Sequence, residues 1–282
     1  MKLAVVTDST AFLSDEVKQK ENLFVISIPV ILDGQIYQEG IDIKANDYYS
    51  LLKSSKKFPT TSQPALGEML DLYQSIANQG YDTIISIHLS SGISGFVNNL
   101  QSIASSVEGV TIYSFDSLIT SSPMGHMVAV ALEMGEEGRS IEEILQRLTE
   151  IKEHSSAYLI VNDLNNLVRG GRLTNGAALI GSLLKIKPIL TFTDGKIVVF
   201  EKIRSSKKAF SRVEKLIGEQ IKKSPYPLKF FVIHGNDLET AEKEKEALQK
   251  KYPEIDVQIS YFGPVIGTHL GEKAIGIGWS PQ

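Results

Sequence analysis

The chain has 282 residues, of which 42% are hydrophobic and 22% are charged, an ordinary composition for a globular protein of one large or two smaller domains. Its formal net charge of −4 gives no overall field that would attract nucleic acid. The sequence contains no cysteine, which excludes disulfides, thiolate catalysis and zinc held by cysteine.

Signals for export and for membrane insertion are not found in the sequence. Asp8 comes too early for a signal peptide, and no apolar run approaches the ~20 residues that a membrane helix needs. We therefore expect a soluble protein located in the cytoplasm.

Strand-like and helix-like segments alternate in the first half of the chain. In chain order we expect a strand over 3–7, a helix over 14–21, a strand over 23–32, helices over 46–55 and 64–80, a strand over 82–89, a helix from about Ser94 and a strand over 110–117. Asp33-Gly34 marks a tight turn, and Asn46 suits the cap of the helix that it begins. Pro64 and Gly80 suit the two ends of the next helix.

Two further helices complete the first half, the second opening with a capping box from Ser140 to Glu143. Short apolar strands that alternate with helices are typical of a parallel sheet covered on both faces. We therefore predict an N-terminal three-layer α/β/α domain with a mainly parallel sheet over residues 1–155.

The pattern changes near Ser155. We expect a strand over 157–163, a glycine-punctuated helical stretch beginning at 164, a hairpin over 188–203 that turns at Asp194-Gly195, a helix over 206–223, a strand over 228–235 and a helix over 237–252. Residues 257–279 are interpreted as strands interrupted by glycines. These elements predict a second α/β domain over residues 156–282, with a mixed or antiparallel sheet, and hence an α/β protein of two domains.

Polar residues gather where the predicted parallel strands end, at 7–10, 88–95 and 116–117. A fourth polar cluster, over 59–64, is expected to open a helix. Ligands of parallel sheets bind outside the carboxyl ends of the strands. These turns are therefore candidate parts of a binding site.

Ser94 stands before a predicted helix, where a serine usually caps the first backbone N–H groups. The same helix end could instead bind an anion. The same two interpretations, helix cap or anion site, apply at the start of another predicted helix, where Thr60, Thr61 and Ser62 stand. If the two turns converge in space, they could hold one carboxylate or phosphate.

The serines also raise the possibility of a hydrolase, whose nucleophile elbow reads G-x-S-x-G. Around Ser94 the second glycine comes one place early, at Gly95, and Phe96 occupies the position of the small residue. Ser91 has Leu89 where the first glycine is needed. A base could still come from one of the five histidines, which are His88, His126, His154, His234 and His269. Serine hydrolysis remains a less favoured alternative.

No phosphate-binding loop, dinucleotide fingerprint or H-E-x-x-H motif occurs, and the scattered histidines lead us to expect no metal. His269 is either an exposed turn residue or a polar contact from the second domain to a ligand. Arg169, Gly170, Gly171 and Arg172 could bind phosphate or an acidic partner, or could form a solvated helix end.

Five segments together resemble the DegV family, a bacterial lipid-binding family that includes the fatty-acid-binding subunit of fatty acid kinase. They are "VTDST", "TSQP", "IHLSSGISG", "VRGGRL" and "GTHLGEKAIGIGW", in this order over most of the chain. The resemblance implies two α/β domains that enclose one long-chain fatty acid. Its carboxylate would be held by Thr61 and Ser94, with Ser62 and Gly95 nearby and His269 in the same polar network.

The resemblance also implies a partner. A separate ATP-dependent kinase subunit would phosphorylate the bound carboxylate, and the acyl phosphate would enter phospholipid synthesis. The segment from Arg169 to Arg172 would be the docking surface. The protein itself would then be a binding protein without catalytic residues, cofactor or nucleic-acid partner, and with at most transient membrane contact. A sensor of lipids or other carboxylates, without a phosphorylated product, is the alternative.

One departure from the family pattern stands next to the expected carboxylate site. The family commonly reads Ser-Gly-Thr-Tyr, whereas this chain reads Ser94-Gly95-Phe96-Val97. We expect the exchange to alter the pocket or the acyl chain that it prefers.

Overall fold

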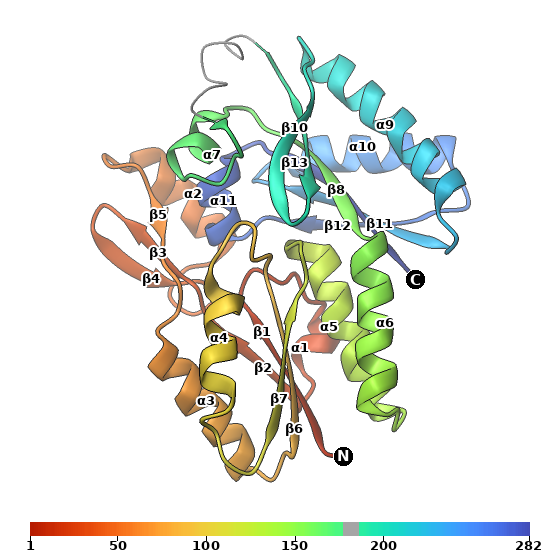
Figure 1. Cartoon of the computed structure of the whole chain (residues 1–282). Coiled ribbons are helices and arrows are strands. Elements are labelled where there is room, and N and C mark those ends of the chain that lie inside the picture. Colours follow the sequence, from red (N-terminus) through yellow and green to blue (C-terminus); the bar gives the residue numbers. More distant parts are fainter. Residues whose placement is uncertain (177–185) are drawn as a thin grey trace.

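A computed structural model describes residues 1–176 and 186–282, and their strands form three sheets (Figure 1). The predicted α/β fold is confirmed, with a parallel sheet formed by the N-terminal half and a mixed sheet formed by the C-terminal half.

The parallel sheet has the strand order β2-β1-β6-β7. Its strands are β1 (Leu3–Asp8), β2 (Leu23–Ile26), β6 (Thr83–His88) and β7 (Thr111–Asp116). Every residue of the two central strands is buried, as their continuous apolar runs predict for strands covered on both faces. All four strands end at the same edge, which brings the predicted polar turns together.

Helices cover both faces of this sheet. They are α1 (Asp15–Lys18), α3 (Leu66–Asn78), α4 (Phe96–Ala104), α5 (Ser121–Glu136) and α6 (Ile141–His154). Helices α3 and α4 pack together on one side, while α5 crosses the other side against β1 and β6 (Figure 1). The capping box predicted for Ser140 and Glu143 begins α6.

The six-stranded sheet has the order β10-β9-β8-β13-β11-β12, with β11 and β12 parallel and the other neighbours antiparallel. Its strands are β8 (Ser156–Ile160), β9 (Ile189–Thr193), β10 (Lys196–Glu201), β11 (Leu228–His234), β12 (Asp256–Tyr261) and β13 (Ile275–Pro281). The predicted hairpin is confirmed as β9 and β10.

Successive residues of β8 face two different hydrophobic cores, one on each side of the six-stranded sheet. Tyr158 and Ile160 pack beneath α9 (Ser206–Lys223) and α10 (Leu238–Lys251), whereas Ala157 and Leu159 belong to the core shared with the parallel sheet. Helix α5 packs on β1 and β6 and also on β11 and β13, so it lies between the two larger sheets. The first strand of the second sheet begins at Ser156, but the division of the chain into domains at residue 155 stays a prediction.

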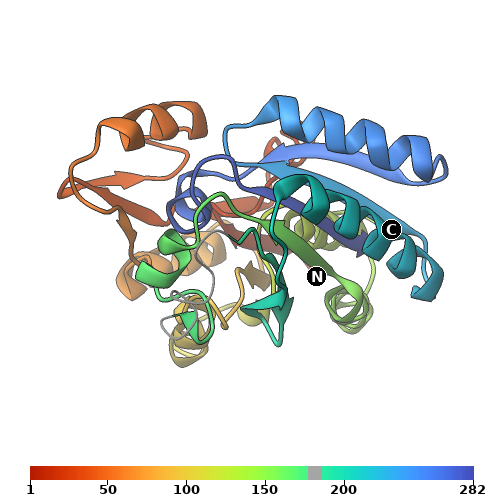
Figure 2. The same cartoon turned by 90° about the horizontal axis from the view of Figure 1, so that it is seen from above.

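The segment from 23 to 32 is not one strand, as we expected, but two strands in different sheets. Strand β2 ends at Ile26, and β3 (Pro29–Leu32) pairs with β4 (Gln35–Gln38) and β5 (Thr60–Thr61). The Ser27 hydroxyl donates to the Glu39 carbonyl, and the Ile28 N–H donates to the Ser9 hydroxyl. Hydrogen bonds with side chains thus replace backbone strand pairing where β2 ends. Figure 2 shows this small sheet to one side of the larger ones.

Two further expectations in this region are wrong. Helix α2 (Ala45–Ser54) follows Lys44 and has no side-chain cap, so Asn46 lies inside the helix. Thr60 and Thr61 form strand β5 and do not open a helix, since α3 begins only at Leu66. Thr61 thus lies on β5, at the edge of the three-stranded sheet.

The C-terminal segment contains a helix that the sequence did not predict. Helix α11 (Pro264–Leu270) interrupts the expected strands. An oxygen of the Glu39 carboxyl group accepts the Val265 N–H at 3.0 Å, and burial raises the pKa of this group to about 8. Gly267 lets the helix approach α2, because a Cβ there would lie 2.5 Å from the Tyr49 hydroxyl.

None of the helices in the described residues is long and apolar enough to span a membrane. The helical stretch predicted from residue 164 is present as α7 (Asn165–Arg169). Any part of that prediction over residues 177–185 lies outside the described residues.

Candidate ligand-binding site

A cavity lies between the carboxyl edge of the parallel sheet and the inner face of the six-stranded sheet. The space without atoms in and around it, including the open solvent at its mouth, is about 760 Å³. Its walls are mostly apolar and include Leu89, Leu159, Phe192, Ile233, Phe262 and Val265. Polar side chains join them, contributed by Thr61, Ser62, Gln63, Ser94, Arg172 and His269 among others.

Thr61 and His269 meet at this cavity although 208 positions separate them in the sequence. Thr61 Oγ1 lies 2.8 Å from His269 Nε2, which joins β5 to α11. His269 is only 9% exposed, so its interpretation as an exposed turn residue is wrong. The other interpretation, a polar contact from the second domain to a ligand, stays a prediction, and the contact that the structure shows is the one with Thr61.

The environment of His269 keeps the ring neutral. Burial, and to a smaller extent the charge of Arg172, lowers the pKa of His269 to about 4. Nδ1 is buried without a partner in the described part of the chain, beside Gly170, where a Cβ would lie 2.5 Å away. Because an unpaired N–H is rarer in protein interiors than an unpaired acceptor, this favours the proton on Nε2. His269 then donates to Thr61, whose own hydroxyl proton is free.

Ser94 precedes α4 but does not cap it in the usual position, since Gly95 is the N-cap residue. The Ser94 hydroxyl accepts the Phe96 N–H at 3.3 Å, and the Ser94 N–H donates to the Ser90 carbonyl at 3.0 Å. Like Thr61, Ser94 therefore uses its oxygen as an acceptor and keeps a proton to donate.

The four residues from Arg169 to Arg172 occupy different environments. Arg172 lines the cavity, and its guanidinium donates to the carbonyls of Ile93, at 3.2 Å, and Gly170. Gly170 leaves room for the His269 ring. Arg169 is exposed and lies over the Phe58 ring at 5.5 Å, and Gly171 is also exposed.

The comparison with known sequences decides the family. The family described as "Uncharacterised protein, DegV family" matches residues 2–282. The chain belongs to the DegV family. A DegV domain-containing protein of Listeria monocytogenes is 47% identical over 279 residues, which cover 99% of this chain and 98% of the relative.

Solved DegV structures share the whole architecture. A fatty acid binding DegV family protein of Streptococcus agalactiae has a TM-score of 0.95 and 40% identity, covering 100% of this chain and 99% of that one. DegV of Bacillus subtilis, described as a fatty acid binding protein, has a TM-score of 0.92 and 44% identity, with 100% of both chains covered.

The structure thus brings the predicted DegV site residues Thr61, Ser62, Ser94 and His269 to one cavity, while their role in binding stays a prediction. Gly95 does not line the cavity; a Cβ there would lie 3.0 Å from Gln63 Nε2. Phe96 and Val97 are buried away from the cavity, and Phe96 packs on His88. The expected effect of this exchange on the pocket would therefore have to act through other residues.

Sequence reasoning missed the part played by the β9–β10 hairpin. Phe192 and Ile197 line the cavity, and the Ser90 hydroxyl donates to the Gly195 carbonyl at 2.7 Å. Gly92 abuts the same turn so closely that a Cβ would collide with Gly195. In the sequence, only Gly92 and Gly195 indicated that these two turns come close together.

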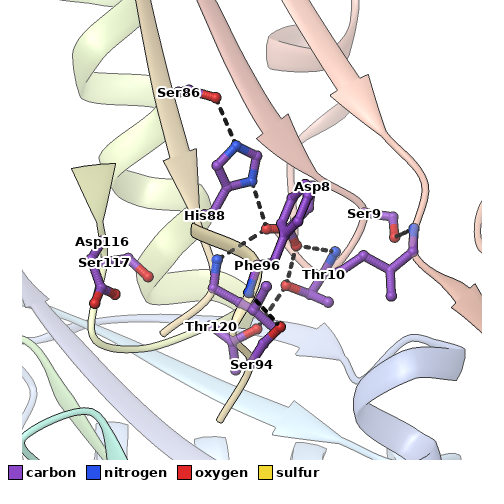
Figure 3. A network of polar contacts seen from close by, with 12 residues as sticks. Asp8, Ser9, Thr10, Ser86, His88, Ser94, Phe96, Asp116, Ser117 and Thr120 are labelled. Atoms are coloured by element: carbon purple, nitrogen blue, oxygen red, sulfur yellow. Dashed lines mark hydrogen bonds and ion pairs between the residues drawn. The ribbon is translucent and has the colours of Figure 1, made fainter. Parts of the chain in front are cut away.

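A row of Asp8, His88 and Ser86 has the order of a hydrolase triad, with His88 Nδ1 3.0 Å from Asp8 and Nε2 2.7 Å from Ser86 (Figure 3). All three side chains are fully buried, and none lines the cavity. In the described residues, neither Ser91 nor Ser94 bonds to a histidine. This geometry gives no support to the hydrolase alternative.

Among residues 1–176 and 186–282, no group of three or more histidine, aspartate or glutamate side chains could hold a metal ion.

Proposed function

We propose that this chain binds one long-chain fatty acid in the cavity, with the carboxylate between Thr61 and Ser94. The observation that carries the proposal is an apolar cavity lined by the hydroxyls of Thr61 and Ser94. With the proton of His269 on Nε2, each hydroxyl accepts one hydrogen bond and can donate its own proton to the ligand. Two similar solved structures, from Streptococcus agalactiae and Bacillus subtilis, are described as fatty acid binding. These support the proposal for this chain.

The chemistry of such a ligand suits the cavity. A carboxylate carries a single negative charge, which hydroxyl donors and the nearby Arg172 guanidinium can bind. His269 would fix the Thr61 hydroxyl in the direction of the ligand. The hydrocarbon tail would supply most of the affinity, at roughly 0.8 kcal/mol per buried CH₂, or on the order of 10 kcal/mol for sixteen carbons before ordering costs.

We further propose that the protein acts in the cytoplasm and presents the carboxylate to a separate ATP-dependent kinase subunit, whose acyl phosphate product enters phospholipid synthesis. Arg169 and Gly171 support this role because they are exposed, while Arg172 and Gly170 adjoin the polar groups of the cavity. In this proposal, Arg169 and Gly171 contact the partner, and Arg172 serves both the partner and the ligand.

Native mass spectrometry after gentle purification tests the ligand. We expect one added long-chain acid, and a protein that stays empty and ignores added oleate would contradict the proposal. Thr61→Val should weaken oleate binding about tenfold, the effect of one lost hydrogen bond to a charged group. Thr60→Val is the matched control, because Thr60 is the exposed neighbour on β5 and lines no part of the cavity.

Incubation with a candidate kinase subunit and ATP tests the presentation step. Arg169→Glu should slow acyl-phosphate formation by at least about tenfold while leaving oleate binding unchanged, since charge complementarity at interface edges acts mainly on association. Binding without any phosphorylated product would favour the sensor. Labelling of Ser94 by a fluorophosphonate probe would favour the hydrolase.

A further inference from the structure

Asp8 is a buried carboxylate at the end of β1 that does not line the cavity. Its Oδ1 accepts the backbone N–H of Thr10 at 3.1 Å and the Thr10 hydroxyl at 2.6 Å. Its Oδ2 accepts His88 Nδ1 and the Leu89 N–H, each at 3.0 Å. The roughly four acceptor sites of the carboxylate are therefore occupied by the protein itself.

Through these bonds Asp8 connects the turns that follow three parallel strands (Figure 3). Thr10 follows β1, and Leu89 follows β6. Thr120, after β7, donates from its hydroxyl to Thr10 Oγ1 at 2.9 Å. Leu89 and Thr120 both line the cavity. One buried side chain thus fixes the relative positions of turns that build the cavity wall.

His88 extends the network to the residue that the proposed function assigns to the carboxylate. Its ring packs edge-on against Phe96, with centroids 4.8 Å apart and an angle of 77°. Phe96 is fully buried, begins α4, and donates its N–H to the Ser94 hydroxyl (Figure 3). The place of the His88 ring therefore influences where the Ser94 hydroxyl lies.

Neither ring nitrogen of His88 is free to change partner. Nδ1 bonds to Asp8, and Nε2 bonds to the Ser86 hydroxyl at 2.7 Å, which in turn bonds to the Tyr73 hydroxyl at 2.8 Å. Because a carboxylate only accepts, His88 donates from Nδ1, and in the neutral ring Nε2 then accepts from the Ser86 hydroxyl. Rotating the ring would break both bonds in a fully buried place.

We propose that Asp8 and His88 are positioning residues, which hold Ser94 where it binds the carboxylate of the ligand without touching the ligand themselves. The inference rests on the proposed function. It predicts that a disturbance of the Asp8–His88 bond weakens binding of an acid more than binding of an uncharged lipid with the same hydrocarbon chain.

Two substitutions of His88, each of which imitates one ring nitrogen, test separately the hydrogen bond to Asp8 and the one to Ser86. The amide nitrogen of His88→Asn takes the place of ring Nδ1 and can still donate to Asp8, whereas that of His88→Gln takes the place of Nε2 and reaches only Ser86. Both variants lose the ring contact with Phe96. We expect His88→Gln to weaken palmitate binding about tenfold relative to His88→Asn, because only His88→Asn keeps the charge-assisted bond.

The measurement is the dissociation constant of palmitate and of hexadecanol, by competition with a fluorescent fatty acid, at a temperature where circular dichroism shows each variant folded. The hexadecanol constants of the two variants should agree within about twofold, because the apolar walls are unchanged. Leu148→Ala, in the buried face of α6, is the control for lost stability alone and should leave the palmitate-to-hexadecanol ratio as in the wild type.

A third variant tests the other link of the network if His88→Gln does not fold. Phe96→Leu keeps every polar bond but removes the aromatic contact with His88, and should weaken palmitate about threefold with hexadecanol unchanged. Equal weakening of acid and alcohol, or an unchanged preference for the acid in all variants, would overturn the positioning role. A wild-type protein that binds palmitate no tighter than hexadecanol would instead contradict the proposed function itself.

Discussion

At the scale of single residues, burial decides what His269 can do. An exposed histidine is partly protonated near pH 6.5, but this ring is enclosed beside the Arg172 guanidinium, and its pKa falls to about 4. At neutral pH it therefore adds no charge to the site. It serves as a neutral hydrogen-bond donor that fixes the Thr61 hydroxyl, so the polar part of the cavity is set by geometry as much as by charge.

This shift makes the stability of the ligand-free protein depend on pH. The unfolded chain binds a proton at His269 near pH 6.5, whereas the folded protein binds it only near pH 4. The contribution is complete above pH 6.5 and is lost as the pH falls from 6.5 to 4, by about 3 kcal/mol in total. We expect His269→Gln, which can still donate to Thr61, to flatten this part of the profile.

Urea unfolding at several pH values between 7 and 4 measures the effect. Burial lowers the pKa of His126 and of His234 as well, but both residues remain in the variant, so their contributions cancel in the comparison. An unchanged slope in His269→Gln would show that His269 is not the group responsible.

At the scale of elements, the end of α7 packs closely against α11 because Gly170 has no side chain there. Gly170 has helical backbone angles, φ −71° and ψ −12°, at which alanine would ordinarily stabilise the protein by about 0.5–1 kcal/mol. Here the Cβ would lie 2.5 Å from His269 Nδ1 and 3.0 Å from the Asn166 carbonyl. The ring must then shift from its place, which disturbs its hydrogen bond to Thr61.

Gly170→Ala should therefore weaken oleate binding about tenfold, while Gly171→Ala should not. Gly171 has a φ of +70° with open space around it, so its substitution should cost only about 1 kcal/mol of stability through backbone strain. Isothermal calorimetry with oleate and thermal unfolding of both variants make the comparison. Unchanged oleate binding in Gly170→Ala would mean that the ring contact is irrelevant to the ligand.

The same elements show how far the sequence could predict the structure. Strands β1 and β6 and the capping box of α6 are encoded by neighbouring residues, and the sequence predicts them. Helix α11 depends on Glu39, 226 positions before the Val265 N–H that it accepts, and no local pattern contains that contact. The residues of the site were predicted by resemblance. Their meeting in one cavity depends on the Thr61–His269 contact, which joins β5 to α11.

At the scale of the whole molecule, the cavity lies where two sheets and α5 leave apolar surface unfilled. A ligand there would contact both halves of the chain and should stabilise them together. By mass action, a fatty acid at one hundred times its dissociation constant would add about 2.7 kcal/mol to the free energy of unfolding. The side chains of the six-stranded sheet that line the cavity should limit the length of the hydrocarbon chain that fits.

Ala157 on β8 offers a test of this limit, because its small side chain lines the cavity. Ala157→Leu should reduce the space available to the hydrocarbon tail, so that affinity shifts from eighteen-carbon toward fourteen-carbon acids by about tenfold in ratio, or roughly the free energy of two CH₂ groups. The bond between Thr61 and His269 would be untouched. Dissociation constants for a series of saturated acids measure the shift.

The control is a similar enlargement on the opposite face of the same sheet. Ala241 is fully buried in α10 against that face, so Ala241→Leu should cost about 1–3 kcal/mol through overpacking without changing the order of preferred chain lengths. An equal change of preference in both variants would mean that general loosening of the fold sets the chain length. A change confined to Ala157→Leu would place the hydrocarbon tail against β8, between the two sheets.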